Sequence, residues 1–384
     1  MIKLLTVVGA RPQFIKSAAI SRSIAQDFSS EIKEVIVHTG QHYDPNMSDV
    51  FFTELSIPKE KYNLGIGSSN HASQTAQIMI SLDKVVEDEK PSALLLYGDT
   101  NSTLAACLVA VKRHIPIIHI EAGVRSYNKK FPEEVNRIIC DHMSSLLFVP
   151  SEDGMLNLEK EGCSAEETLP GNSLLLNAPN MYRCGDIMYD NTLYFSDKAD
   201  VYFANLCQRY GLPENNFIMV TAHRPSNVDE SRTLKNIIMF FHYAIDVLGK
   251  KIVFPIHPRT KKLIEQDTEL SNLIEKEGIH CIPPISFIEM IGLEKNSDLV
   301  VTDSGGVQKE AYFMEKPCLI MLEETPWVEL VESKKAKLVG HNYELLCEGA
   351  KFYLENKPSN FEPLYGDGAS AKFICETILK NIKK

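Results

Sequence analysis

The 384-residue sequence contains no apolar run that approaches the roughly 20 residues of a transmembrane helix. The first residues, MIKLLTVVGARPQF, are apolar only as far as Gly9, which is too short for a signal peptide, and no small-residue cleavage site follows. The nine cysteines are isolated, without a CxxC pair or paired Cys/His spacing, which argues against disulfides and a zinc site. These absences predict a cytoplasmic protein that has no membrane segment.

Positive charge is also in short supply. The sequence has 40 Lys and Arg residues against 51 Asp and Glu residues, a formal net charge of −11, which argues against nucleic acid or an anionic membrane as a partner. An anionic ligand must then be bound by local cations and backbone amides. Neither GxGxxG nor GxxxxGK[ST] occurs, so the sequence predicts no NAD site and no P-loop.

Short apolar, β-branched runs alternate with stretches of helix length. Runs that are apolar throughout are typical of strands buried on both faces. Repetition of strand and helix predicts an α/β fold in which helices cover both faces of a parallel sheet. The runs are residues 4–8, 35–38, 93–97, 115–120, 146–149, 217–221, 252–255, 299–302 and 318–321.

The alternation pauses between residues 164 and 182, a stretch rich in Asn, Pro, Ser and Leu that we interpret as a loop or an inserted hairpin. It restarts afterwards, which together with the chain length predicts two domains with a break near residue 183. Ligands of doubly wound sheets bind beyond the carboxyl ends of the strands. Polar segments follow several predicted strands there, in both halves of the chain, and this predicts one active site made by both.

In the second half, Ser304-Gly305-Gly306 follows a predicted strand and precedes a predicted helix. The backbone N–H groups at such a helix start, with the helix dipole, can bind a phosphate. The alternative is a tight turn with Ser304 as the N-cap. Glu310 lies further along the helix, where its carboxylate either accepts ribose hydroxyls or is simply solvated.

In the first half, Arg11 and Lys16 flank the first strand-to-helix turn and could converge on one anion. The alternative is that both are solvated on a surface helix. The carboxylates of the first half, with His223 from the second half, suit removal and return of a proton, although single carboxylates at strand ends are commonly caps or ion-pair partners. These carboxylates are Asp99, Glu121 and Glu133. His119, on an apolar strand, is predicted to be a hydrogen-bonded core histidine.

Ordered sequence motifs along nearly the whole chain resemble the non-hydrolysing UDP-N-acetylglucosamine 2-epimerases. In the first half they are Gly9-Ala10-Arg11-Pro12-Gln13-Phe14-Ile15-Lys16, His38-Thr39-Gly40-Gln41-His42, Gly98-Asp99-Thr100, His119-Ile120-Glu121-Ala122-Gly123-Val124-Arg125 and Pro132-Glu133-Glu134-Val135-Asn136-Arg137. In the second half they are Ala222-His223-Arg224, Asp303-Ser304-Gly305-Gly306-Val307-Gln308-Lys309-Glu310 and Tyr365-Gly366-Asp367-Gly368.

The resemblance implies a glycosyltransferase-B-like fold of two Rossmann-like domains that face a cleft, residues 1–183 plus 369–384 and residues 184–368, with the last helix crossing back to the first domain. It also implies a homodimer, no cofactor, no metal and a UDP-sugar substrate. By this similarity the diphosphate is bound by Ser304, Gly305 and Gly306, and the ribose by Glu310. Arg11, Lys16 and Arg137 bind the phosphate and sugar side, and Asp99, Glu121, Glu133 and His223 form the catalytic set.

That residue set fits the chemistry that the family's reaction requires. C2 of an N-acetylhexosamine is not next to a carbonyl, so a base must take its proton while UDP leaves C1, which gives a 2-acetamidoglycal. Reprotonation on the other face and return of UDP then give the epimer. Carboxylates near C2 and cations around the departing diphosphate serve these two steps.

The sequence departs from the family's commonest GTRPE opening, since it reads Gly9-Ala10-Arg11-Pro12-Gln13. With residues 43–50, 97–103 and 327–331, this opening resembles the branch that acts on UDP-2,3-diacetamido-2,3-dideoxyglucuronate. Both substrates stay open, as does an effector site beside Gln41 and His42. A hydrolysing epimerase, a glycosyltransferase of the same fold and a non-catalytic nucleotide-sugar binding protein are the rival functions.

Overall fold

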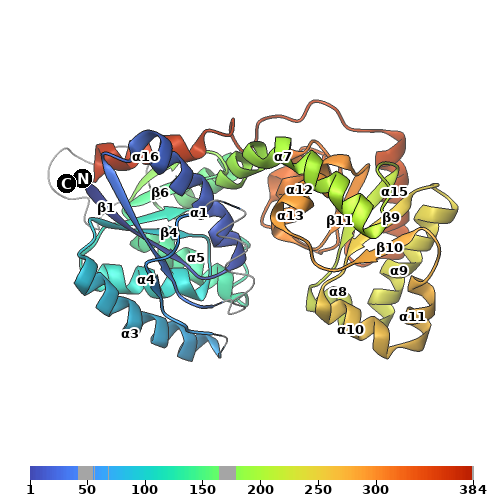
Figure 1. Ribbon diagram of the computed structural model, residues 1–384, viewed down its shortest axis with the longest axis horizontal. Coiled ribbons are helices and arrows are strands. Elements are labelled where there is room, and N and C mark those ends of the chain that lie inside the picture. The colour runs from blue at the N-terminus through green and yellow to red at the C-terminus, as the bar shows by residue number, and fades with distance from the viewer. Residues whose placement is uncertain (42–54, 56, 68, 164–178, 383–384) are drawn as a thin grey trace. The chain divides into compact units, whose positions relative to one another are not determined.

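The structure is a computed structural model, and it describes residues 1–41, 55, 57–67, 69–163 and 179–382. The chain divides into two compact units (Figure 1). Unit 1 comprises Met1–Asn191 and Pro363–Lys384, and unit 2 comprises Thr192–Glu362. The proposed loop or hairpin at 164–182 lies mostly outside the described residues, as do His42 and residues 43–50 of the branch comparison.

Unit 1 is built on a seven-stranded sheet in the order β3-β2-β1-β4-β5-β6-β7, in which all neighbouring strands run parallel. The central strands are apolar on both faces because helices pack on both sides of the sheet. The strands are β1 (Ile2–Val8), β2 (Ile32–His38), β3 (Tyr62–Asn63), β4 (Ala93–Tyr97), β5 (Ile117–Ile120), β6 (Leu146–Val149) and β7 (Asn180–Arg183).

The helices of unit 1 follow these strands in turn, and the last helix returns to this unit from the end of the chain. Asp190 holds that helix, because its carboxylate accepts the backbone N–H groups of Ser370 and Ala371 at 3.2 and 2.7 Å. The helices are α1 (Arg11–Ser23), the π-helical turn η1 (Ile24–Phe28), α3 (His71–Glu89), α4 (Asn101–Lys112), α5 (Pro132–Met143), α6 (Glu152–Lys160) and α16 (Ser370–Asn381). Helix α7 (Ile187–Tyr210) begins in unit 1 and continues into unit 2.

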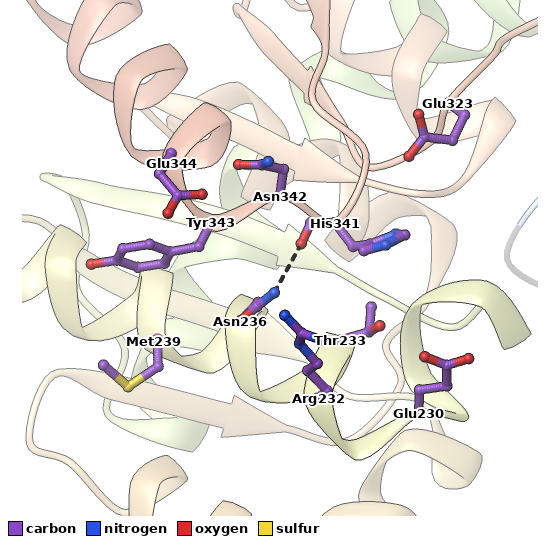
Figure 2. A pocket seen from close by; sticks show the side chains of 10 residues that line it. All are labelled: Glu230, Arg232, Thr233, Asn236, Met239, Glu323, His341, Asn342, Tyr343 and Glu344. Carbon is purple, nitrogen blue, oxygen red and sulfur yellow. Dashed lines mark hydrogen bonds between the residues drawn. The ribbon is translucent and has the colours of Figure 1, made fainter.

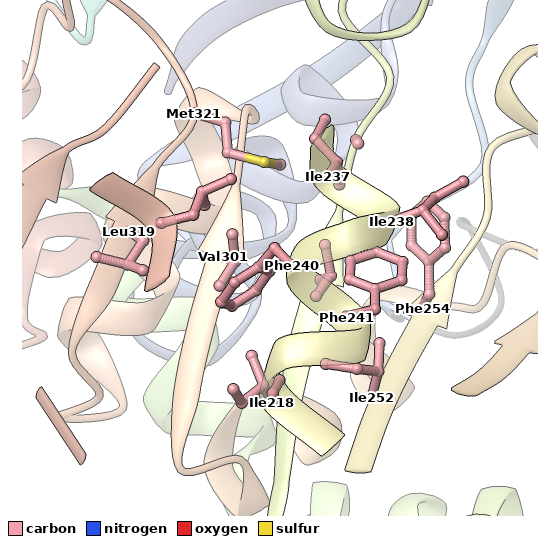
Figure 3. Packing of buried hydrophobic residues seen from close by; sticks show 14 of the residues in the cluster. Ile218, Ile237, Ile238, Phe240, Phe241, Ile252, Phe254, Val301, Leu319 and Met321 are labelled. Carbon is pink, nitrogen blue, oxygen red and sulfur yellow. The ribbon is translucent and has the colours of Figure 1, made fainter. Parts of the chain in front are cut away.

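Unit 2 contains a six-stranded parallel sheet in the order β10-β9-β8-β11-β12-β13. Phe240 and Phe241 pack against Phe254 and Ile218 in its core (Figure 3). The strands are β8 (Phe217–Thr221), β9 (Lys251–Pro255), β10 (Ile279–Ile282), β11 (Leu299–Thr302), β12 (Cys318–Ile320) and β13 (Ala336–Leu338). The helices are α8 (Pro225–Val228), α9 (Ser231–Asp246), α10 (Pro258–Gln266), α11 (Thr268–Ile274), α12 (Phe287–Asn296), α13 (Gly305–Phe313), α14 (Val328–Glu332) and α15 (Tyr343–Glu355).

The predicted architecture of two doubly wound parallel sheets is therefore confirmed. In both sheets the strand order places the first strand of the unit in the interior, so the loops that follow the central strands lie at one edge. Among the described residues, no helix is long and apolar enough to cross a membrane. The same residues contain no group of three His, Cys, Asp or Glu side chains placed to hold a metal ion.

Candidate active site

The unit 1 part of the site begins with Asp99, directly after β4. Arg137 on α5 contacts it, with 3.1 Å between Nε and the Asp99 carboxylate. The Asn136 amide donates to the Asp99 backbone carbonyl at 2.8 Å, so two neighbouring residues of one helix fix this turn. The Asp99 side chain keeps 31% of its surface exposed, which leaves it accessible to a ligand.

The electrostatic surroundings of Asp99 suit a proton-transfer group. Burial raises the pKa of Asp99 above its ordinary value, and the nearby Glu121 and Glu133 carboxylates act in the same direction. The Arg137 and Lys16 cations act against that rise. A carboxyl group whose pKa is moved toward neutrality can take and return a proton more readily than an ordinary aspartate.

Glu121 follows β5 and has a backbone φ of 70°, in the left-handed region that non-glycine residues rarely adopt. Its carboxylate forms an ion pair with Lys16 on α1, and Oε1 of Glu121 lies 2.7 Å from Nζ of Lys16. Lys16 is buried. The alternative of a solvated Lys16 is therefore wrong. Glu133 lies in the first turn of α5 with an exposed side chain, and Arg11 is the first residue of α1 and half-buried.

Gln13 joins two of these turns through hydrogen bonds of its side chain, a role that the sequence did not reveal. Its side-chain oxygen accepts the backbone N–H groups of Gly9 and Ala10, at 2.8 and 3.1 Å. Its amide nitrogen donates to the Tyr97 carbonyl at 2.8 Å. One buried amide thus connects the turn after β1 with the end of β4, directly before Gly98 and Asp99. A glutamine can do both because its side chain carries an acceptor and two donors.

In unit 2, Asp303 organises the turns that follow β8 and β11. One carboxylate oxygen accepts the backbone N–H groups of His223 and Arg224 and the Asn227 amide, at 2.9, 2.8 and 3.0 Å. The other oxygen lies 2.9 Å from Nδ1 of His223. Burial by itself raises the pKa of Asp303, but the contact with His223 and the hydrogen bonds from Arg224 and Asn227 hold it below its ordinary value. The Asp303 carboxylate therefore favours its ionised form and lies at ion-pair distance from the His223 ring.

Ser304 occupies the N-cap position of α13, but its side chain makes no capping hydrogen bond there. Gly305 and Gly306 begin the helix. A Cβ atom added to either glycine would come no closer than 3.5 Å to its neighbours, so the packing of the protein does not require glycine here. Close approach of a ligand to the backbone is another physical reason for glycine, and it is the reason that the phosphate interpretation gives.

Glu310 is buried on α13, so a solvated helix residue is the wrong description. Glu294, on α12, is buried beside it, and burial together with the Glu310 charge raises the pKa of Glu294 well above its ordinary value. Two buried carboxyl groups side by side disfavour double ionisation. The surroundings of Glu294 therefore favour its neutral form beside Glu310.

A pocket of about 630 Å³ lies elsewhere in unit 2, between α9, the segment after β12 and the start of α15 (Figure 2). The side chains that line it are mostly polar, and the Asn236 amide donates to the His341 carbonyl at 3.4 Å. None of the predicted site residues lines this pocket. The candidate site is instead the set of strand-end turns described above.

The model of the family described as UDP-N-acetylglucosamine 2-epimerase matches residues 25–379. The chain belongs to this family. A UDP-2,3-diacetamido-2,3-dideoxy-D-glucuronate 2-epimerase of Pseudomonas aeruginosa is 40% identical over 99% of this chain and 100% of its own length. A UDP-N-acetylglucosamine 2-epimerase homolog of Methanococcus maripaludis is 39% identical, again over 99% of this chain and all of its own length.

Among solved structures, the UDP-GlcNAc 2-epimerase of Methanocaldococcus jannaschii in complex with UDP-GlcNAc and UDP superimposes with a TM-score of 0.85. It is 36% identical and covers 99% of this chain and 100% of its own. The predicted family and the glycosyltransferase-B-like fold are therefore confirmed. This member of the UDP-N-acetylglucosamine 2-epimerase family is an isomerase.

Proposed function

We propose that this epimerase interconverts the C2 epimers of a UDP-N-acetylhexosamine, of the UDP-GlcNAc to UDP-ManNAc type, and keeps the UDP linkage in the product. The observation that carries the proposal is the unit 1 cluster, in which the Asp99 and Glu121 carboxylates follow neighbouring strands and each is paired with a cation. Solved relatives with UDP-GlcNAc bound support a UDP-sugar as the ligand.

The reaction proceeds by elimination and re-addition. A carboxylate takes the C2 proton, the C–H electrons form the C1=C2 double bond, and the C1–O bond breaks to release UDP. The 2-acetamidoglycal is then protonated at C2 on the other face, and UDP returns to C1. Net oxidation state does not change, so no redox cofactor is needed. Asp99, Glu121 and Glu133 are the proposed proton carriers.

The departing diphosphate is the second requirement. Ser304, Gly305 and Gly306 are proposed to bind it through backbone N–H groups at the start of α13, with Glu310 on the ribose hydroxyls. Arg11, Lys16, Arg137 and His223 are proposed to stabilise the negative charge that develops as the C1–O bond breaks. The Asp303 carboxylate orients the His223 ring for that role.

A second candidate is the same chemistry on UDP-2,3-diacetamido-2,3-dideoxyglucuronate. The 40% identical relative from Pseudomonas aeruginosa favours it, as does the sequence Trp327-Val328-Glu329-Leu330-Val331. That substrate carries an extra acetamido group at C3 and a carboxylate at C6. The two candidates differ in substrate and not in reaction.

Proton NMR in D2O tests both candidates in one experiment. The protein is incubated with UDP-GlcNAc and, separately, with the diacetamido uronate. Deuterium at C2 of an intact UDP-sugar supports the proposal and identifies the substrate. Free UDP with a reducing sugar indicates a hydrolase, transfer only after an acceptor is added indicates a glycosyltransferase, and no reaction with either sugar contradicts the proposal.

We also propose that the enzyme is a cytoplasmic homodimer. All nine cysteines lie within the described residues and are free, which suits a reducing compartment. The dimer rests on family resemblance, and sedimentation at several protein concentrations measures it. A mass of one chain, 43.2 kDa, at micromolar concentration contradicts the dimer.

A further inference from the structure

A buried polar network lies behind the carboxylate turns of unit 1. His119 on β5, Asp141 on α5 and Arg125 are all buried, in a sheet whose strands are otherwise largely apolar. His119 Nδ1 lies 2.7 Å from one Asp141 oxygen, and Arg125 NH1 lies 2.7 Å from the other. The prediction that His119 is a hydrogen-bonded core histidine is thus confirmed, but its partners give it more than a packing role.

The second ring nitrogen of His119 points at the first of the two turns. Its Nε2 lies 2.7 Å from the backbone carbonyl of Gly98. A carbonyl oxygen only accepts hydrogen bonds, so Nε2 carries a proton and donates. Gly98 has a φ of 60° and directly precedes Asp99. The His119 ring therefore fixes the peptide plane from which Asp99 projects.

Asp141 holds the second turn. The carboxylate oxygen that contacts Arg125 also accepts the backbone N–H of Gly123 at 3.0 Å. Gly123 stands two residues after Glu121, whose φ of 70° is strained for a non-glycine residue and persists only where the surrounding structure enforces it. Burial by itself raises the pKa of Asp141, but the His119 and Arg125 contacts hold that pKa below its ordinary value. The Asp141 carboxylate therefore stays an acceptor of hydrogen bonds.

We propose that His119, oriented by Asp141, is a positioning residue for the epimerisation, because it fixes the Asp99 turn relative to the Glu121 turn. The pair joins the carbonyl of Gly98 to the N–H of Gly123 through only two side chains. Proton transfer on two faces of one carbon requires two carboxyl groups at a set separation, and a shift of about 1 Å costs on the order of 100-fold in rate. This inference rests on the proposed function of Asp99 and Glu121.

The test compares His119→Leu with His119→Gln in the full-length enzyme. Leucine fills the space but donates nothing, whereas the glutamine amide can still donate to the Gly98 carbonyl. We expect His119→Leu to lower kcat about 100-fold with KM changed less than about threefold, and His119→Gln to recover at least about tenfold of that loss. UDP affinity should stay within about threefold of wild type in both variants, because neither substitution changes a residue proposed to contact the diphosphate or the ribose.

Leu94→Ala is the matched control for loss of stability. Leu94 is buried near the start of β4, at the opposite end of the strand from the Asp99 turn, and its truncation lowers stability through a cavity without removing a polar contact. We expect its kcat within about threefold of wild type at a temperature where it is folded. UDP binding and near-UV circular dichroism show which variants are folded.

Three results overturn the inference: a kcat of His119→Leu within about threefold of wild type, a glutamine variant no better than the leucine variant, or an equal loss in Leu94→Ala. If His119→Leu does not fold, the test is the kcat of His119→Gln relative to that of Leu94→Ala, since glutamine loses only the Asp141 contact. We expect the kcat of His119→Gln to be at least about threefold lower than that of Leu94→Ala, and a smaller difference overturns the inference. Failure of the wild-type enzyme to exchange the C2 proton, in contrast, contradicts the proposed function.

Discussion

At the scale of single residues, Gly305 and Gly306 differ from Gly123 in what the packing of the protein requires of them. A side chain on Gly123 would overlap the Gly154 carbonyl, and Gly123 also has a positive φ, so the fold itself requires that glycine. Gly306 has neither constraint, and the nearest atoms to an added Cβ lie 3.9 Å away. These glycines look alike in the sequence, and only the structure separates them.

We therefore predict that Gly306→Ala binds UDP at least about tenfold more weakly, about 1.4 kcal/mol, because the methyl group occupies the space of the diphosphate. The free energy of unfolding should stay within about 1 kcal/mol of wild type, since alanine is the better helix former. Isothermal titration calorimetry and urea denaturation measure the two quantities. Gly123→Ala should instead lose stability, and an unchanged UDP affinity in Gly306→Ala would remove the diphosphate from this turn.

Glu294 gives a prediction about pH. Burial and the Glu310 charge raise the pKa of Glu294 in the folded protein and so favour its neutral form, whereas in the unfolded chain it ionises above an ordinary pKa of about 4.3. Above that pH the unfolded chain binds fewer protons at Glu294 than the folded protein does, which lowers the free energy of unfolding. The stabilising contribution of neutral Glu294 is therefore fully present below that pH and is lost as the pH rises toward the pKa of the folded state. The free energy of unfolding falls by at most about 1.4 kcal/mol per pH unit.

Glu294→Gln keeps the shape of the side chain but cannot ionise. We predict that the unfolding free energy of this variant, relative to wild type, increases from about pH 5 to about pH 8. Urea denaturation at several pH values measures the difference. Glu355→Gln, at an exposed position of α15, is the control and should show no such trend. A parallel pH dependence in Glu294→Gln and wild type would mean that Glu294 is ionised in the folded protein.

At the scale of elements, the sequence revealed the interior strands and missed the edges. The apolar runs at 93–97, 146–149, 217–221 and 299–302 coincide with β4, β6, β8 and β11. The runs do not include β3, β7, β10 and β13, which are the outer strands of the two sheets. An edge strand is only partly covered, so it mixes polar and apolar residues and lacks the continuous run that marks an interior strand.

The same reasoning explains which site residues could be found. Asp99, Glu121, His223 and Ser304 follow interior strands, so their place at one edge of each sheet followed from the α/β pattern. Gln13 could not be found in this way, because its partners, the N–H groups of Gly9 and Ala10 and the Tyr97 carbonyl, include a strand 84 residues away. Every residue carries the same backbone groups, so the sequence does not show which of them a side chain contacts, and such contacts are seen only in the structure.

Gln13 supplies the prediction at this scale. Gln13→Ala leaves the Gly9 and Ala10 N–H groups without this partner, whereas the Tyr97 carbonyl keeps the Thr103 hydroxyl, and each buried unpaired group costs about 1–3 kcal/mol. We expect at least about 2 kcal/mol less stability and a lower kcat, measured by urea denaturation and by the NMR assay. Gln13→Glu, which introduces the residue of the family's commonest opening, keeps the acceptor and loses only the donor. It should lie between alanine and wild type, and equal stability of all three would contradict this assignment.

At the scale of the whole molecule, each unit has its own parallel sheet and its own core, and the proposed ligand contacts are divided between them. The proposed proton carriers belong to unit 1, together with the cations Arg11, Lys16 and Arg137, whereas the proposed backbone contacts to the diphosphate and the Glu310 contact to the ribose belong to unit 2. This division gives a prediction that single substitutions cannot provide, because different parts of the substrate are assigned to different units.

Hydrogen exchange of backbone amides, read by mass spectrometry, can follow both units at once. We predict that UDP alone protects the turn at Ser304–Gly306, whereas the intact UDP-sugar also protects the turns at Gly98–Asp99 and Glu121–Gly123. A ligand at about 100 times its dissociation constant stabilises its site by about 2.7 kcal/mol, so protection in a bound turn should rise by up to about 100-fold. If UDP-sugar protects unit 2 alone, the carboxylates do not meet the hexosamine. The chain would then bind the nucleotide without a catalytic base, and the epimerase mechanism would need other residues.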